Sequence, residues 1–337
     1  VRGVTLDSDG NLWVAMLAGL ACRTADGWKF YTGHEGLPYN DFTSIAAGPD
    51  GAVWFGTTKG IVRFKNGTWH YLQGRRWLPD DHVNDLLVDQ AGNAWAATQH
   101  GIGWIGFTPM TLAEKAAFYE EELDKYIKRT PFGYTSEVKL EKAGDRSTVV
   151  YTDSDNDGLW TSMYGAGECF AYGATRDPEA KKRADKAFEA LRFLQTVPQT
   201  GDHRPPKGYV ARTILPTDGK DPNEGRIERD TYHRDNHDVL WKVYEPRWPK
   251  SGDGKWYWKS DTSSDEIAAH FYGVTVFHQL AARGAEKDRA AEHLRRIADH
   301  IIATRSTAAA IRLSSDASQN PAAPIGGCIR NASHQPP

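Results

Sequence analysis

The stretch GPDGAVWFGTTKGI, residues 48–61, decides the first part of the fold because two other stretches repeat its pattern. DSDGNLWVAMLAGL occupies residues 7–20, and DQAGNAWAATQHGI occupies residues 89–102. Trp54 follows Trp13 by 41 positions, and Trp95 follows Trp54 by the same step. Two sets of glycines keep this step as well. One unit is therefore present three times.

Each unit contains the signals of four short strands. FTSIAAGP at residues 42–49 alternates apolar and polar side chains, and Asp-Gly then provides a hairpin turn. AVWFGTT at residues 52–58 predicts the second strand, and IVRFKNGTWHYL at residues 61–72 predicts two more across Asn-Gly. Repeats of about 40 residues with several strands are typical of a β-propeller. We expect three four-stranded blades over residues 1–108.

The pattern D-x-x-G-x-x-W-x-x-T-x-x-G-(I/L) resembles the propeller repeat in the sensor regions of two-component regulators. The resemblance covers residues 1–107 and implies that the tryptophans are packing wedges between neighbouring blades. Closed propellers typically have four to eight blades. We therefore expect an incomplete ring, with N-terminal blades absent from this chain; the alternative is an open stack of three sheets with an exposed edge.

Opposite charges nearly balance along the 337-residue chain, with 41 Lys and Arg against 44 Asp and Glu and a net charge of −3. This balance gives no electrostatic footprint for nucleic acid and no basic segment for an anionic membrane. No run of about 18 apolar residues is present, so we expect no membrane insertion. The three cysteines are too scattered for a disulfide framework or a zinc site, and we expect no cofactor.

Beyond Phe107 the hydrophobic pattern changes from an alternating to a helical period. We expect residues 109–130 to form a linker helix. Residues 131–303 follow as a second domain, which an insertion rich in Pro, Gly, Asp and His interrupts at residues 198–255. Residues 304–337 have no aromatic residue and no sustained apolar period, so we expect a disordered or aberrant tail.

Helices of the second domain occur in pairs of different character. Residues 159–175 carry almost no charge and are expected to be buried on all sides, whereas the helix that starts at Asp177 and Pro178 is amphipathic. The same contrast recurs between residues 264–282 and 286–303. Inner and outer helices in series are the organisation of an (α/α) toroid, in which inner helices surround a funnel. With two hairpins present, we expect an incomplete toroid.

Three acids in DSDNDGLW, residues 153–160, precede the first inner helix. A helix N-terminus stabilises carboxylates, but capping needs only one of them, so we expect at least one to bind substrate or act in catalysis. The alternatives are simple capping with a solvated loop, or a calcium loop. Asp153, Asp155 and Asp157 match the first ligand positions of a calcium loop, but its twelfth position, which requires Glu, is Tyr164.

The stretch WYWKSDTSSDEIAAHFYG, residues 256–273, opens the second inner helix with aromatic residues, acids and a histidine. Ser263 or Ser264 is the expected cap, and Glu266 and His270 share a helix face. Aromatic rings stack on the apolar faces of sugars, and paired carboxyl groups supply acid and base or acid and nucleophile. The pattern indicates sugar chemistry; the alternative is a capped helix with a solvated first turn.

The pieces DNDGLW and SDTSSDE resemble the layout of (α/α)-barrel glycoside hydrolases and polysaccharide lyases, including the unsaturated-glucuronyl type. The resemblance implies that acids at the N-termini of inner helices line the funnel. It makes Asp157 and Asp265 the acid and base candidates, with carboxylates about 5–10 Å apart in an aromatic-lined pocket. Asp261 and His270 would support them.

Candidates for substrate binding surround these acids. Arg212 and Lys259 carry charges that suit a uronate carboxylate. In a lyase, the resemblance implies that His270 and a tyrosine, either Tyr164 or Tyr272, take and give the protons. The aromatic candidates are Trp160, Tyr164, Trp258 and Tyr272.

We therefore expect a secreted or periplasmic carbohydrate-active enzyme, a glycoside hydrolase or polysaccharide lyase. Its substrate would be an acidic poly- or oligosaccharide, with the propeller as the binding module. The alternatives are a non-catalytic propeller protein that senses glycans and a toroid scaffold without activity.

Overall fold

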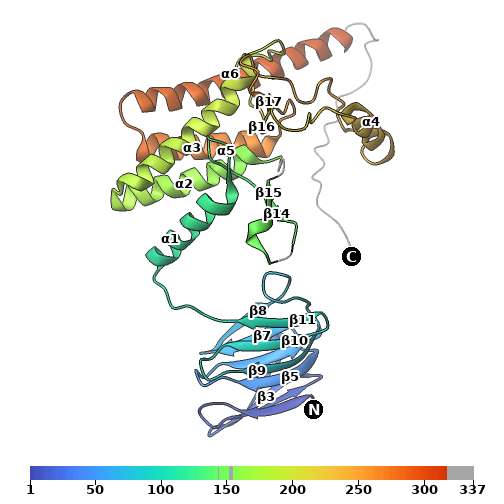
Figure 1. Cartoon of the computed structure of the whole chain (residues 1–337), viewed down its shortest axis with the longest axis vertical. Helices are drawn as coiled ribbons and strands as arrows, with labels where there is room; N and C mark the ends of the chain where they lie inside the picture. Colours follow the sequence, from blue (N-terminus) through green and yellow to red (C-terminus); the bar gives the residue numbers. More distant parts are fainter. Residues whose placement is uncertain (143, 152–154, 317–337) are drawn as a thin grey trace. The chain divides into compact units, whose positions relative to one another are not determined.

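The computed structural model describes residues 1–142, 144–151 and 155–316. The chain forms two compact units, Val1–Leu112 and Ala113–Pro337 (Figure 1). The first unit consists of antiparallel sheets, and the second consists mainly of helices. Among the described residues, no helix has the length and apolar character needed to span a membrane.

The first two copies of the repeat each form a four-stranded antiparallel sheet with its strands in sequence order. The first sheet contains β1 (Gly3–Leu6), β2 (Leu12–Met16), β3 (Gly19–Thr24) and β4 (Gly27–Tyr31). The second contains β5 (Phe42–Ala47), β6 (Val53–Thr57), β7 (Gly60–Lys65) and β8 (Thr68–Leu72). Gly60 has a φ of +110°, and a Cβ there would lie 2.6 Å from the carbonyl oxygen of Leu72, so this hairpin requires glycine.

The third sheet has three strands, β9 (Val83–Val88), β10 (Ala94–Thr98) and β11 (Gly101–Ile105), so the expected fourth strand is wrong. No Asn-Gly turn follows β11, and Pro109 has no N–H to donate to a ladder. Residues 106–111 have no regular structure. The three sheets are nevertheless propeller-like blades, each built from one copy of the repeat.

Tryptophan wedges pack between the sheets. Trp13 is buried between the first and second sheets, and Trp54 between the second and third. Trp95 has the same place in the repeat but is partly exposed, because no further sheet among the described residues covers it. The indole N–H of Trp13 donates to Asp7 at 2.8 Å, and that of Trp95 donates to Asp89 at 3.1 Å. The first and third copies thus share a local hydrogen bond, whereas the second copy has Gly48 in place of the aspartate and the buried indole N–H of Trp54 has no partner among the described residues.

The helical unit opens with α1 (Leu112–Glu122) and a π-helical turn at Leu123–Ile127. The expected linker helix over residues 109–130 is therefore too long. Lys128 is extended, and β12 (Lys128–Arg129) pairs with β13 (Tyr134–Thr135). A second hairpin joins β14 (Val138–Leu140) to β15 (Val149–Tyr151).

Two helical hairpins form the centre of this unit. One contains α2 (Asp157–Thr175) and α3 (Pro178–Thr196). The other contains α5 (Ser264–Val276), a π-helical turn (Phe277–Ala281) and α6 (Ala285–Asp316). The side chain of Asp177 accepts the N–H of Glu179, and Pro178 lies in the first turn, so the predicted start of α3 is confirmed.

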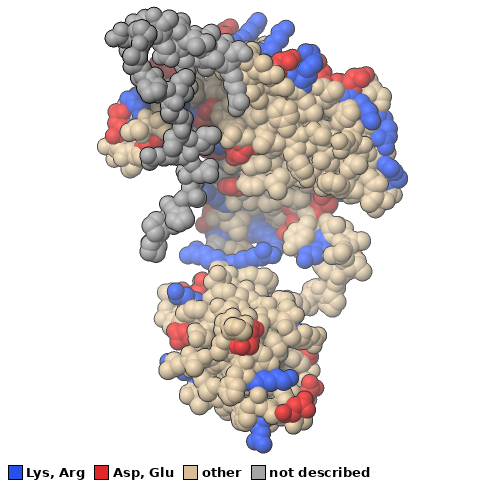
Figure 2. Space-filling model, turned by 180° about the vertical axis from the view of Figure 1, so that it is seen from behind, with Lys and Arg blue, Asp and Glu red and all other residues tan. Residues whose placement is uncertain are grey.

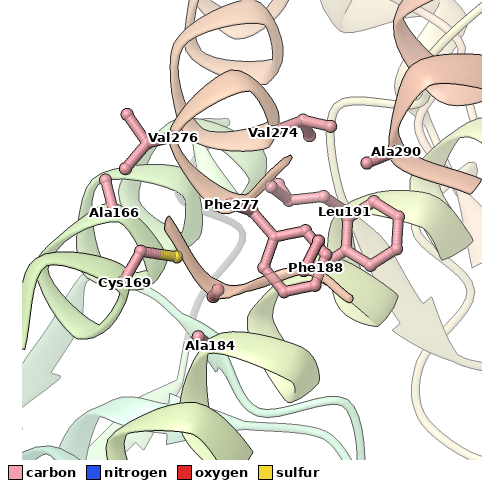
Figure 3. Packing of buried hydrophobic residues seen from close by; sticks show 11 residues of the cluster. Ala166, Cys169, Ala184, Phe188, Leu191, Val274, Val276, Phe277 and Ala290 are labelled. Atoms are coloured by element: carbon pink, nitrogen blue, oxygen red, sulfur yellow. The ribbon is translucent and has the colours of Figure 1, made fainter. Parts of the chain in front are cut away.

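The core between these helices contains closely packed apolar side chains (Figure 3). Phe188 of α3 stacks on Phe277, with ring centroids 4.5 Å apart. Ala166 and Cys169 come from α2. Small residues on α2 let the neighbouring helices approach closely, since a Cβ on Gly165 would lie 2.8 Å from the Cβ of Ala187.

One face of α2 is open, so the expectation that this helix is buried on all sides is wrong. Met163 and Phe170 are 55% and 54% exposed. The helix packs against α3 and α5, and these neighbours cover only part of its circumference. A weakly charged helix can therefore lie at the edge of a cluster of helices.

The predicted insertion, residues 198–255, contains β16 (Ile214–Pro216) and α4 (Arg226–Asn236). β16 pairs with β17 (Trp256–Trp258), which follows the insertion. Short 3₁₀ turns elsewhere lie at Gly33–Glu35, Arg146–Thr148 and Val197–Gln199.

Helix α6 continues past residue 303, so the predicted start of the disordered tail is wrong. Residues 304–316 contain three consecutive alanines and neither Gly nor Pro, a composition that favours continuation of a helix. The rest of the predicted tail, residues 317–337, lies outside the described residues.

Candidate functional site

The N-termini of α2 and α5 meet inside the helical unit. Ser263 caps α5 by accepting a hydrogen bond from the N–H of Glu266. The carboxyl group of Glu266 contacts the neighbouring helix: its Oε1 accepts a hydrogen bond from the N–H of Leu159, in the first turn of α2, at 3.2 Å. A side chain of α5 therefore satisfies a free backbone donor of α2.

Gly158 makes this contact possible. A Cβ at this position would overlap with Oε2 of Glu266 and lie 3.1 Å from Nε2 of His270. Both of these atoms are buried and lack a hydrogen-bond partner among the described residues. The other ring nitrogen of His270 lies 3.0 Å from Nε2 of His293, on α6. Glu266, His270 and His293 thus form a buried polar cluster.

Burial controls the protonation of this cluster. It raises the pKa of Glu266 to about 8, against the effect of the N–H of Leu159, which stabilises the carboxylate. It lowers the pKa of His270 to about 3, and it holds the pKa of His293 well below its ordinary value. Near neutral pH the cluster holds a protonated carboxyl group beside neutral imidazoles, and such a group can donate a proton.

Replacing Glu266 with glutamine is expected to stabilise the chain at alkaline pH. The folded chain keeps the Glu266 proton up to about pH 8, whereas the unfolded chain releases it near 4.5, so the contribution of Glu266 to the free energy of unfolding falls as pH rises between these values. Glutamine cannot ionise and can still accept the N–H of Leu159. The advantage of Glu266→Gln over the parent chain should grow by about 3 kcal/mol between about pH 5.5 and pH 8.

Urea unfolding at a series of pH values, followed through amide exchange of α5, measures this difference. Asp265→Asn is the matched control. Asp265 is exposed, and a hydrogen bond with Ser263 lowers its pKa, so the control should leave the slope above about pH 5.5 unchanged. A stability gain in Glu266→Gln that does not vary with pH would contradict a protonated buried carboxyl group.

Asp157, the first predicted catalytic acid, is fully buried and paired with a cation. Its Oδ2 contacts the guanidinium of Arg129 and accepts from the hydroxyl of Thr213. Arg129 also donates to the carbonyl of Ile214 at 2.8 Å. This environment favours a structural role, because the carboxylate is neutralised and has no access to solvent.

The other predicted acids have different surroundings. Asp265 is exposed on the first turn of α5. Asp261 accepts from Arg247, a buried side chain that also donates to Asp230 at 2.6 Å. The interior position of Asp157 and the surface position of Asp265 do not form one open funnel. The catalytic roles of these acids and of His270 remain predictions.

Two predicted substrate-binding residues instead hold the segment before α2. Arg212 donates to the carbonyl of Asp155 and, at 3.4 Å, to the side-chain oxygen of Asn156. The ammonium group of the buried Lys259 pairs with the carboxylate of Asp155. The structure therefore brings these two cations together at one loop.

The calcium alternative loses support from the same contacts. Asp155 and Asp157 are each paired with a cationic side chain. Asp153 lies outside the described residues. Within the described ranges, no three His, Cys, Asp or Glu residues are arranged to hold a metal ion.

The predicted aromatic residues are distributed over several environments. The hydroxyl of Tyr164 donates to Glu120 at 2.9 Å and accepts from Lys128 at 2.8 Å, in a polar cluster of its own. Trp160 is half-buried, and Tyr272 is 51% exposed. Trp258 lines a cleft, described next.

A cleft of about 390 Å³ lies on the helical unit, mostly within residues 198–255. This volume is within the range of small-molecule sites. Aromatic, charged and proline side chains form its lining: Tyr209, Tyr244 and Trp258, then His203, Arg204 and Glu245, then Pro205, Pro246 and Pro249, with Ser260.

Neighbouring contacts hold the aromatic rings in place. The hydroxyl of Tyr209 donates to the carbonyl of Ser260, and its ring meets Trp258 edge to face at a centroid distance of 6.4 Å. The guanidinium of Arg247 lies 5.2 Å from the ring centre of Tyr244, and two carboxylates anchor it. Rings that are fixed before binding lose little entropy when a ligand arrives.

Sequence reasoning found only Trp258 in this cleft. Tyr209 and Tyr244 lie far apart in a segment with no regular hydrophobic period. The available signal was the aromatic and proline content of that segment, together with its length.

The repeat in the sheet-rich unit has known counterparts. Residues 36–59 match the family described as two component regulator propeller. The match covers β5 and β6 of the second sheet. Among solved structures it is similar to the extracellular domain of the hybrid two-component system BT3049 from B. thetaiotaomicron, with 30% identity and a TM-score of 0.27 over 30% of this chain and 15% of that chain.

Two further solved structures match. One is the extracellular domain of the hybrid two-component system BT4673 from B. thetaiotaomicron, with 20% identity and a TM-score of 0.28 over 33% of this chain and 16% of that chain. The other is streptogramin B lyase, with 22% identity and a TM-score of 0.27 over 32% of this chain and 36% of that chain. The chain thus covers only 15% to 36% of the length of these structures. No curated protein matches it.

Proposed function

We propose that this chain is a carbohydrate-binding sensor protein whose helical unit binds an oligosaccharide in the aromatic cleft. The cleft carries the proposal, since the half-buried rings of Tyr209 and Tyr244 line about 390 Å³ beside the buried ring of Trp258 and charged side chains. Aromatic faces suit the apolar faces of sugar rings, and a few polar groups orient the ligand. The cleft replaces the propeller as the proposed binding module.

Arg204 favours an acidic oligosaccharide as the ligand. Its side chain lies on the exposed rim of the cleft, and its Nε donates to the carbonyl of Gly201 at 2.8 Å. Its two Nη groups have no partner among the described residues. A guanidinium fork can bind a carboxylate through two parallel hydrogen bonds, which suits a uronate.

The propeller repeat supports the sensor part of the proposal, because its family is described as a regulator propeller. We place the protein outside the cytoplasm, secreted or periplasmic, where it would meet such oligosaccharides.

Tyr244→Ala is expected to raise the Kd for an acidic oligosaccharide about 10-fold or more, because it removes a held aromatic surface. Titration calorimetry with tetramers of galacturonate, mannuronate and hyaluronan provides the measurement. Tyr232→Ala, an exposed tyrosine on α4, is the control and should leave the Kd unchanged. Arg204→Ala should weaken binding of these tetramers but not of neutral cellotetraose. Equal losses in the Tyr244 and Tyr232 variants would contradict the proposal.

A glycoside hydrolase or polysaccharide lyase is the second candidate function, and Glu266 favours it. Its pKa of about 8 suits a general acid at neutral pH. It lies where α2 and α5 meet, and we propose that their two hairpins are part of an (α/α) toroid. Such a site requires an opening to the buried cluster.

Incubation with the same oligosaccharides tests this second candidate. New reducing ends alone indicate hydrolysis, and reducing ends with the ultraviolet absorbance of an unsaturated uronate indicate elimination. Either activity should be lost in Glu266→Gln. Binding without either product supports a protein that only binds.

A further inference from the structure

The aromatic cleft of the helical unit carries charges of both signs, and the proposed function uses only the positive one. Arg204 belongs to one part of the lining, and Glu245 comes from a distant part of the chain. No ion pair joins these two side chains among the described residues, although they line the same cleft. A cation and an anion that do not neutralise each other remain available to a ligand.

The carboxylate of Glu245 is exposed and has no hydrogen-bond or ion-pair partner among the described residues. The cation nearest to it in sequence, Arg247, is already engaged. Its Nε donates to Asp230 at 2.6 Å, and its Nη groups donate to Asp261 and to the carbonyl oxygen of Lys242. Because Arg247 is also buried, it does not turn outward to neutralise Glu245.

The backbone on both sides of Glu245 is held in place. Before it, the ring of Tyr244 lies 5.2 Å from the guanidinium of Arg247. After it, the hydroxyl of Ser260 donates to the carbonyl of Pro246 at 3.4 Å, and the N–H of Ser260 donates to the carbonyl of Arg247 at 2.8 Å. Glu245 therefore extends from a fixed segment, between two other residues that line the cleft.

An ammonium group suits this part of the cleft. It donates charge-assisted hydrogen bonds to a carboxylate, and the faces of aromatic rings attract it. Tyr244, next to Glu245 in the sequence, provides such a ring in the same cleft. On the face of the helical unit seen in Figure 2, acidic and basic side chains are interspersed, and neither sign covers a broad area. Selectivity for charge therefore depends on contacts within the cleft.

We propose that the cleft selects an oligosaccharide that carries an unsubstituted amino group together with a uronate carboxylate. Glu245 binds the ammonium group, and Arg204 binds the carboxylate. Neutral and purely acidic oligosaccharides use only part of this lining. The inference rests on the proposed function, because it requires a sugar ligand in the cleft, and it names the class of that ligand.

Titration calorimetry of the full chain with two forms of one hyaluronan tetramer tests the proposal. The amino groups of the first form are acetylated, and the second form is the same tetramer after chemical N-deacetylation. At about pH 6, where an alkyl amine is protonated, the parent chain should bind the deacetylated form about 5-fold more tightly. A larger factor is not expected, because solvent screens an ion pair with the exposed Glu245.

The ratio of the two dissociation constants is compared among variants, since effects common to both tetramers cancel in it. Glu245→Gln should bring the ratio close to one, because glutamine carries no charge. Arg204→Ala should weaken binding of both forms and keep the ratio. Glu224→Gln is the matched control, because Glu224 is an exposed acid of the same insertion that pairs with Lys220, outside the lining of the cleft. It should also keep the ratio.

Equal binding of the two forms by the parent chain would overturn this inference and leave the proposed function in place. Equal loss of the preference in the Glu245 and Glu224 variants would also overturn it, since net charge would then explain the effect. If neither form binds, and the galacturonate and mannuronate tetramers do not bind either, the proposed function fails as well.

Discussion

Replacing Gly158 with alanine is expected to destabilise the helical unit by about 3 kcal/mol or more. The new Cβ would overlap with Oε2 of Glu266 and lie 3.2 Å from the side chain of Leu194. Either α2 must move away from α5, or Glu266 must lose the N–H of Leu159. Urea unfolding, followed through amide exchange of α2, should give a lower free energy of unfolding for this variant. A probe within α2 prevents the unfolding of the sheet-rich unit from masking the change.

Gly167 provides the control on the same helix. A Cβ at Gly167 would meet nothing within 4 Å. Gly167→Ala should therefore stabilise α2 by about 0.5–1 kcal/mol, through helix propensity and the smaller entropy of the unfolded chain. A similar effect of both substitutions would contradict the close approach of α2 and α5 at Gly158.

Replacing Arg129 with methionine is expected to lower the free energy of unfolding of the helical unit by about 3–5 kcal/mol, because it removes the cation that pairs with the buried carboxylate of Asp157. The hydroxyl of Thr213, which also donates to Asp157, carries no positive charge to balance it. Adding Asp157→Asn to the Arg129→Met chain should recover part of the loss, since the buried group is then neutral. The same exchange measurement, made on both variants, gives the two free energies.

Arg146→Met is the matched control for a cation in an ion pair. Arg146 pairs with Glu122 at the surface, where such a pair contributes about 0–1 kcal/mol. Equal costs at Arg129 and Arg146 would mean that Asp157 reaches solvent, and the predicted catalytic role of Asp157 would regain support.

The repeat predicted the sheets well because its signals are local. Asp-Gly turns and alternating side chains determine each hairpin within about ten residues. The fourth strand of the third sheet was predicted by analogy with the other copies, although its Asn-Gly turn is absent. The exposure of Trp95 could not be predicted from the strand itself, because it depends on whether another sheet is present.

The acids at the start of α5 show why the site was harder to predict. Asp265 and Glu266 are neighbours, and one step along a helix turns a side chain by about 100°. The way in which α2 crosses α5 decides which of the two acidic side chains faces inward. The spacing of residues along the sequence does not reveal that crossing. Glu266 and His270 could be placed on one face from their spacing, but their contact with Gly158 could not.

The cleft is formed by contacts between residues that lie still farther apart in the sequence, so it was harder to predict. Strand pairing aligns Ile214, within the predicted insertion, with Trp258, just after it. Two carboxylates from different segments anchor Arg247, whose guanidinium lies over the ring of Tyr244. Composition indicated aromatic side chains in this region. Their convergence depends on tertiary structure.

A crystal structure of the chain with an acidic tetrasaccharide tests the central claim most directly, because it locates the ligand. The account predicts a sugar ring against Tyr244 or Tyr209, with a uronate carboxylate at Arg204. A tetrasaccharide bound only to the sheet-rich unit, with the cleft of the helical unit empty, would contradict it.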